Sequence, residues 1–169
     1  MTSSSPSEYA PSVGRSKTIQ KFWVPATGRP VRPGNEEADL GINISVVFTS
    51  VDSTLSALRA AGTLASSLGA RITLLVPQVV PHPLPLENPP VSAQFNEARF
   101  RVIVSRSPVQ ARVRIYLCRD RTQALKSVLN PGSIVIIGGR KRWCWPTRDE
   151  RLARWLRRAG HEVIFTEAE

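Results

Sequence analysis

Residues 133–165 have the sequence SIVIIGGRKRWCWPTRDERLARWLRRAGHEVIF, which decides the fold class of this chain. Ile134 to Ile137 form an apolar, β-branched run that ends in Gly138 and Gly139, as expected for a strand buried on both faces of a parallel sheet. Val163 to Phe165 begin another strand. The stretch therefore predicts a strand, a glycine turn, a basic aromatic loop, a helix and a second strand.

The helix of this stretch carries its own start and stop signals. Thr147 and Glu150 have the spacing of a capping box, and acidic residues in the first turn favour the positive end of the helix dipole. Gly160 suits the C-terminal end. One face is apolar, with Leu152, Trp155, Leu156 and Ala159. Since ligands of α/β sheets bind where turns leave the carboxyl ends of strands, a small-molecule site is expected between Gly138 and Thr147.

A second unit of the same kind lies near the start of the domain. Residues 42–48 predict a strand, and Asp52 or Ser53 can cap the helix that follows. That helix has an apolar stripe, and Gly69 marks its stop. Residues 72–76 predict the next strand. This strand-helix-strand order implies a parallel pair with a right-handed crossover.

The middle of the chain supplies the remaining elements. Six prolines between Pro77 and Pro90 are expected to break regular structure. Residues 95–103 fit a helix or a strand, and we choose the helix. Residues 112–117 alternate like a strand at a sheet edge, and residues 120–129 predict a short helix. The predicted fold class is α/β, an open five-stranded parallel sheet with helices on both faces.

The first 40 residues differ in composition from the rest. They are rich in Ser, Pro, Gly and charge, so we predict a disordered tail at 1–40 that contributes no strand, followed by one α/β domain at 41–169. The pair Phe22 and Trp23 is either a docking motif or an aromatic patch that packs loosely on the domain.

Charge and cysteine content limit the function classes. The net charge is +10, and 16 of the 23 Lys and Arg residues lie in residues 96–169, which favours anionic partners unless these are simply solvated arginines. Cys118 and Cys144 have no paired spacing, so neither a disulfide framework nor a metal site is predicted. No secretory or membrane-spanning run is evident. A cytoplasmic protein without membrane contact is expected.

From Ile42 to the C-terminus the chain resembles the universal stress protein family. The resemblance rests on VVFTSVDS, on ALRAAGTLASSLGARITLL, on Ser133 to Gly139 and on Arg151 to Phe165. It implies a doubly wound sheet in the order 3-2-1-4-5, often dimeric through the last strand. Some members bind ATP through a loop of the form Gly-x2-Gly-x9-Gly-Ser/Thr. By this resemblance, Asp52, Gly138, Gly139 and Thr147 form the candidate nucleotide site.

The nucleotide loop of this chain departs from the family pattern. Lys141 stands where the second glycine is expected, the final Gly-Ser/Thr pair has no equivalent, and Ser53 replaces a usual glycine. Side chains there would crowd the phosphates. We therefore predict weak or lost ATP binding and no cofactor. Asp52 is either a nucleotide ligand or a helix cap.

The loop at 140–147 suggests a second function. It combines cations with aromatic rings, as single-stranded nucleic-acid sites do, through Arg140, Lys141, Arg142, Trp143 and Trp145. Alternatively, the tryptophans plug the nucleotide pocket or pack in a dimer. No catalytic constellation is evident, so no enzyme is predicted. Two hypotheses stand: a non-enzymatic, universal-stress-like regulatory domain, or an anion-binding module for nucleotide or RNA.

The last strand predicts the assembly. Residues 162–166 are expected at a sheet edge, and natural sheets rarely leave such an edge open. Antiparallel pairing of two copies about a two-fold axis would satisfy both edges. We therefore predict a homodimer through this strand.

Overall fold

The computed structural model describes residues 19–23, 41–86, 93–107, 109–141 and 145–168. Ten elements follow one another along these residues. They are β1 (Ile19–Trp23), β2 (Asn43–Val47), α1 (Val51–Leu68), β3 (Arg71–Val79), α2 (Ala93–Ser105), β4 (Arg112–Cys118), α3 (Arg121–Val128), β5 (Ile134–Gly139), α4 (Arg148–Arg158) and β6 (Glu162–Glu167).

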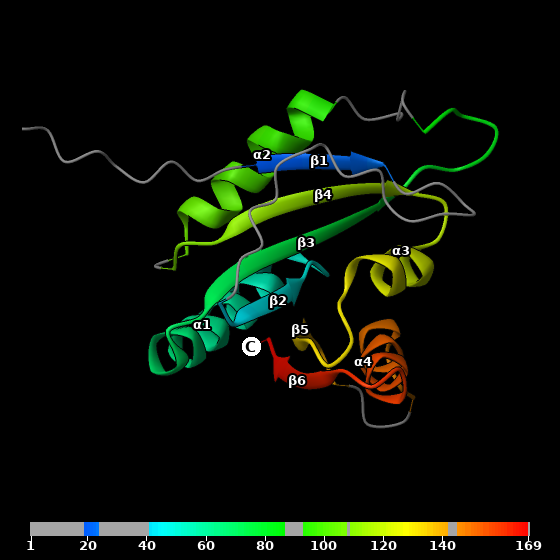
Figure 1. Cartoon of the computed structure of the whole chain (residues 1–169). Helices are drawn as coiled ribbons and strands as arrows, with labels where there is room; N and C mark the ends of the chain where they lie inside the picture. The colour runs from blue at the N-terminus through cyan, green and yellow to red at the C-terminus, as the bar shows by residue number, and fades with distance from the viewer. Residues whose placement is uncertain (1–18, 24–40, 87–92, 108, 142–144, 169) are drawn as a thin grey trace, which may run out of the picture.

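All six strands are parallel, in the order β1-β4-β3-β2-β5-β6 (Figure 1). The five strands from β2 onward have the order 3-2-1-4-5 when they are counted along the chain. This confirms the predicted fold class. The choice of a helix at 95–103 is also confirmed, because α2 turns Phe100 and Ile103 toward the core.

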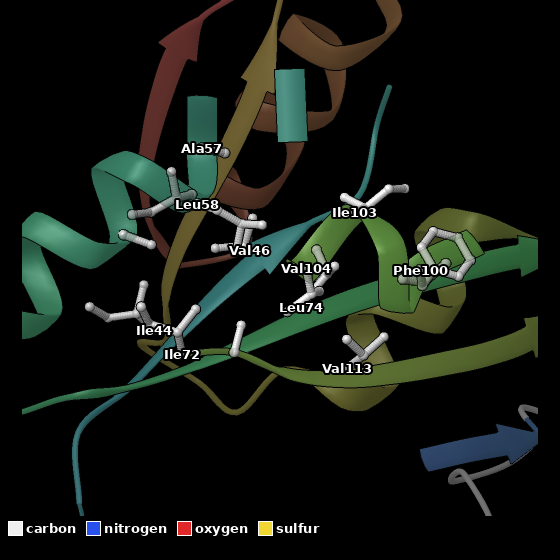
Figure 2. Close-up of a cluster of buried hydrophobic side chains, with 14 of the residues drawn as sticks. Ile44, Val46, Ala57, Leu58, Ile72, Leu74, Phe100, Ile103, Val104 and Val113 are labelled. Carbon is white, nitrogen blue, oxygen red and sulfur yellow. The ribbon is translucent and has the colours of Figure 1, made fainter. Parts of the chain in front are cut away.

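Two hydrophobic clusters cover the two faces of the sheet. On one face α1 and α2 pack on β2 and β3, with Leu58 and Ile103 buried against Val46 and Leu74 (Figure 2). On the other face α3 and α4 cover alternate residues of the same strands, such as Val47. β2 and β5 are therefore buried on both sides, which explains their continuous apolar sequence.

The helix ends show which capping signals operate. In α4 the predicted capping box is confirmed: Thr147 N donates to Glu150 Oε2 at 2.7 Å, and Glu150 N donates to Thr147 Oγ1 at 3.2 Å. In α1 the predicted cap at Asp52 or Ser53 is wrong. Ser50 has an extended backbone and accepts a hydrogen bond from Ser53 N at 3.3 Å, so the helix starts earlier.

β3 extends past the point where prolines were expected to break it. It runs to Val79 and includes Pro77. Phe48 N donates to Leu75 O at 2.9 Å, so the backbone groups of Leu75 point toward β2. Those of Pro77 point the same way, beyond the last residue of β2, and its missing N–H costs no sheet hydrogen bond. β3 therefore continues along β4.

The first strand comes from the segment predicted to contribute none. That prediction is wrong at Ile19–Trp23, which pairs in parallel with β4 from Val113 to Leu117. The run is short, and the open edge of β4 supplies the hydrogen bonds that make it a strand. Residues 1–18 and 24–40 lie outside the described residues, and the prediction of a disordered tail falls on them.

Deletion of residues 1–38 should lower stability, because it removes β1 and exposes the edge of β4. With hydrogen bonds worth about 0.5–1.5 kcal/mol each, we expect a loss of about 2 kcal/mol in the free energy of unfolding. Urea denaturation of the full chain and the deletion variant measures it. Coinciding curves would show that β1 contributes no stability.

Candidate functional site

The candidate site lies at the carboxyl edge of the sheet, where β2 and β5 are neighbours. The chain leaves β2 through α1 toward β3, and it leaves β5 through α4 toward β6 on the opposite side. Such a divergence between adjacent strands is where open α/β sheets bind ligands. The predicted residues Asp52 and Thr147 come from these two connections, and Gly138 and Gly139 are the last two residues of β5.

The predicted glycine turn is wrong, because Gly138 and Gly139 are the last two residues of β5 and pair with β6. Gly138 brings the end of β5 into direct contact with the start of α1. A Cβ atom on Gly138 would lie 1.8 Å from the carbonyl oxygen of Ser53. The Thr49 hydroxyl donates to Gly138 O at 2.8 Å, which ties the loop after β2 to the same point. Packing within the chain therefore requires a glycine at 138, whether or not a ligand binds.

Gly139 is enclosed from the other side. A Cβ atom there would lie 2.7 Å from Cζ of Phe165 and 3.0 Å from Cβ of Asp149. Phe165 belongs to β6, and Asp149 lies in the first turn of α4. Both glycines thus permit close approach by other elements of this chain.

The two predicted polar ligands lie on different helices. Asp52 is exposed in the first turn of α1, near the positive end of that helix. Thr147 is the N-cap of α4, and its hydroxyl accepts from Glu150 N. Asp52 therefore remains accessible to solvent, whereas the Thr147 hydroxyl is already used to cap α4.

The basic aromatic loop is described at three of its predicted residues. Arg140 and Lys141 are exposed, and the Lys141 ammonium forms an ion pair with the carboxylate of Glu167, which raises the pKa of Lys141. Trp145 is 79% exposed. Arg142 and Trp143 lie outside the described residues. Trp145 accordingly does not plug the space beside Gly138.

Arg121 is a residue of this edge that the sequence analysis does not identify. Its Nη2 donates to Phe48 O at 2.7 Å, and its Nη1 lies 3.9 Å from Asp149 Oδ1. Burial lowers the pKa of Arg121 and raises the pKa of Asp149, and each charge partly offsets the shift of the other. Arg121 follows Asp120, the N-cap of α3, so its backbone lies at this edge of the sheet. Its long side chain reaches across to the carbonyl oxygen of Phe48, just after β2.

A second arginine organises the loop after β3. Arg119 donates to the carbonyl oxygens of Val80 at 2.8 Å, Pro81 at 3.1 Å and Leu84 at 2.6 Å. His82, between these carbonyls, is exposed. The Arg119 side chain therefore holds the loop through its backbone carbonyl oxygens, and among the described residues His82 has no partner that would activate it.

Cys118, at the end of β4, is expected to resist alkylation in the folded protein. Burial, helped by Asp120, raises the pKa of its thiol to about 11. At pH 8 the reactive thiolate is therefore scarce. In a Cys144→Ser variant, iodoacetamide should react at least about tenfold faster in urea than in buffer. Equal rates would show that Cys118 is accessible.

Comparisons with known proteins add no further constraint. Neither the models of protein families nor the curated proteins contain a match to this chain. Among the residues that the structure describes, no three His, Cys, Asp or Glu side chains gather as a metal ion would require. No helix of that part of the chain is long and apolar enough to cross a bilayer.

Proposed function

We propose that this chain is a non-enzymatic regulatory domain of the universal stress protein type, dimeric and without the ATP binding of the family's nucleotide-binding members. Three features support the relationship: the strand order 3-2-1-4-5, Asp52 in the first turn after the first strand of that series, and two glycines at the end of the fourth. The main observation in favour of lost ATP binding is the close approach of the Ser53 carbonyl oxygen to Gly138.

That contact matters because phosphate groups bind where glycines leave backbone N–H groups open to approach. Here the space around the two glycines is taken by Ser53, Phe165 and Asp149. Lys141, two residues after Gly139, forms an ion pair with Glu167. An incoming triphosphate would have to displace all of these groups.

The polar groups at this edge also support a non-enzymatic role. Arg121 holds a backbone carbonyl, Thr147 and Glu150 cap α4, and Thr49 holds Gly138. A general acid or base needs a group that is free to reach a substrate. In this arrangement Arg121 and Thr49 are committed to backbone carbonyl oxygens, and Thr147 and Glu150 to the start of α4.

Titration calorimetry with Mg-ATP tests the proposal. We expect no binding with a dissociation constant below about 1 mM, equivalent to less than about 4 kcal/mol of binding free energy. Asp52→Ala is the matched control, and its titration should be the same as that of the wild type. Micromolar, magnesium-dependent binding that Asp52→Ala abolishes would restore the family's site.

The second candidate is an anion-binding module. Residues 140–158 contain eight Lys or Arg and two Asp or Glu. A hollow of about 290 Å³ between α4 and β6 is lined by Lys141, Glu150, Ala153, Arg154, Arg157 and Phe165. Anisotropy of a labelled oligouridylate, measured at several salt concentrations, tests it. Loss of micromolar affinity in Arg151→Glu would favour this function, whereas no binding in low salt would exclude RNA.

A further inference from the structure

The helix α2 carries apolar residues on two sides. On one side Phe100, Ile103 and Val104 turn toward the sheet and are buried (Figure 2). On the outer side of the same helix Phe95 is 63% exposed and Val102 is 52% exposed. A surface helix needs one apolar face to pack on its own sheet. The outer apolar residues of α2 therefore remain at the surface after the core is packed.

These outer residues border a hollow of about 370 Å³ between α2 and the start of α1. The residues that line it include Val51, Phe95, Ala98, Arg99, Val102 and Arg106. A concave apolar surface with a few polar groups receives the side chains of a ligand or partner. A membrane is instead met by apolar residues that protrude into it. The shape of the hollow therefore favours an occupant that inserts its own side chains.

The two arginines of the hollow are spaced by two helical turns. Arg106 N donates to Val102 O at 3.2 Å, which continues the helical spacing one residue past Ser105. Arg99 and Arg106 therefore lie on the side that carries Val102, about 10 Å apart along the helix axis. Both are exposed, and within the described part of the chain neither guanidinium has a hydrogen-bond or ion-pair partner. Basic and apolar residues thus alternate along this side of α2.

This alternation distinguishes between possible occupants. The carboxylate of a fatty acid can pair with one of the two arginines but cannot reach both. A second copy that pairs through α2 about Val102 would set Arg99 against Arg106, and each copy has a net charge of +10. An amphipathic helix with carboxylates seven residues apart presents two negative groups about 10 Å apart, with apolar side chains between them. Charge complementarity therefore favours such a helix.

We propose that the hollow along the outer side of α2 is a docking groove for an acidic amphipathic helix of a partner protein. Apolar side chains of that helix enter the hollow beside Val102, and its carboxylates pair with Arg99 and Arg106. The groove lies on the face of the sheet that α1 and α2 cover, and α4 covers the other face. The inference goes beyond the proposed function and depends neither on ATP binding nor on a dimer.

A designed peptide of the stated chemistry serves as the probe. It is an alanine-based helix of about 20 residues, with leucines and glutamates alternating along one side at the spacing of the groove. One comparison peptide has lysine in place of each glutamate, and another has its glutamates on the side opposite the leucines. Fluorescence anisotropy of each labelled peptide with the full chain, at about 0.15 M salt, measures the dissociation constants.

We expect the glutamate peptide to bind with a dissociation constant of about 100 μM or lower, and the two comparison peptides at least about tenfold more weakly. Val102→Glu places a carboxylate in the hollow and should raise the constant for the glutamate peptide at least about tenfold. The double variant Arg99→Glu, Arg106→Glu should do the same, and it should bind the lysine peptide more tightly than the glutamate peptide.

The double variant Arg151→Glu, Arg158→Glu is the matched control. These two exposed arginines are also seven residues apart, but they lie on α4. The control changes the net charge by the same amount and should keep the constant within about threefold of the wild type. Far-UV circular dichroism checks folding, and Val102→Ser, with a smaller expected increase, replaces Val102→Glu if that variant fails to fold.

Several results would overturn the assignment. No binding of the glutamate peptide with a constant below about 1 mM would exclude the groove, and equal weakening in the α4 control would indicate a general attraction to the positive charge. Equal affinity for the peptide with glutamates on the opposite side would contradict the paired faces. Binding to phosphatidylglycerol vesicles, or a dimer in sedimentation velocity, that Val102→Glu alone abolishes would assign the hollow to a membrane or to a second copy.

Discussion

Replacement of Gly138 by alanine is expected to destabilise the protein by about 3 kcal/mol, at the upper end of typical overpacking effects. The added Cβ would lie 1.8 Å from the Ser53 carbonyl oxygen, a backbone atom in the first turn of α1. A backbone group held by a helix cannot move aside as a flexible side chain can. The melting temperature should fall by roughly 6–12 °C, measured by circular dichroism without nucleotide.

Gly41→Ala is the matched control for this experiment. Its added Cβ would come no nearer than 3.8 Å to a side-chain atom of Arg71, so we expect a change below about 1 kcal/mol. If Gly138 were needed only to let phosphate groups approach, its replacement by alanine would not change the stability of the ligand-free protein. Equal melting temperatures for Gly138→Ala and the wild type would therefore contradict the packing role.

Leu58→Ala should remove between about 2 and 5 kcal/mol from the free energy of unfolding. Leu58 is fully buried in α1 and shares a cluster with Val46 of β2 (Figure 2). Truncation leaves a cavity in the layer that joins α1 to the sheet. Urea denaturation should show a lower midpoint with an unchanged slope.

The same helix offers a control for the leucine substitution. Leu68, at the last turn of α1, is 43% exposed, and Leu68→Ala should cost less than about 1 kcal/mol. The difference between the two variants chiefly reflects the burial of the Leu58 side chain. Equal losses would mean that α1 does not pack through the face that carries Leu58.

Local signals were sufficient for most of the fold. The Thr-x-x-Glu spacing at 147–150 predicted the start of α4, because a capping box depends only on residues of one turn. Gly69 predicted the end of α1 in the same way, through its left-handed backbone. The alternation of apolar strands with amphipathic helices predicted an open parallel sheet, and the resemblance to the universal stress protein family implied the order 3-2-1-4-5.

The errors arose where distant residues decide the local structure. β1 exists because β4 offers an open edge, and Pro77 is tolerated because β2 has already ended. Neither fact is visible within a window of neighbouring residues. Ser50 rather than Asp52 caps α1, a difference of two residues that capping preferences alone do not resolve.

In the candidate site, too, the sequence predicted the positions of residues but missed the contacts between distant ones. Sequence placed Asp52 and Thr147 on the two connections that leave the centre of the sheet, and the structure has them there, whereas Gly138 lies within β5. It did not predict why the glycines are needed. That reason is the approach of Ser53, Phe165 and Asp149, which come from three separate elements. Arg121 was missed because its partner, the carbonyl oxygen of Phe48, follows β2, and β3 separates β2 from β4, the strand that precedes Arg121.

The central claim is that protein groups enclose the two glycines at the carboxyl end of β5. The most direct test is a ¹H–¹⁵N correlation spectrum in which the amides of Gly138 and Gly139 are followed as Mg-ATP is added to millimolar concentration. We expect both signals to keep their chemical shifts. Shifts of these two amides that saturate at micromolar Mg-ATP would contradict the account.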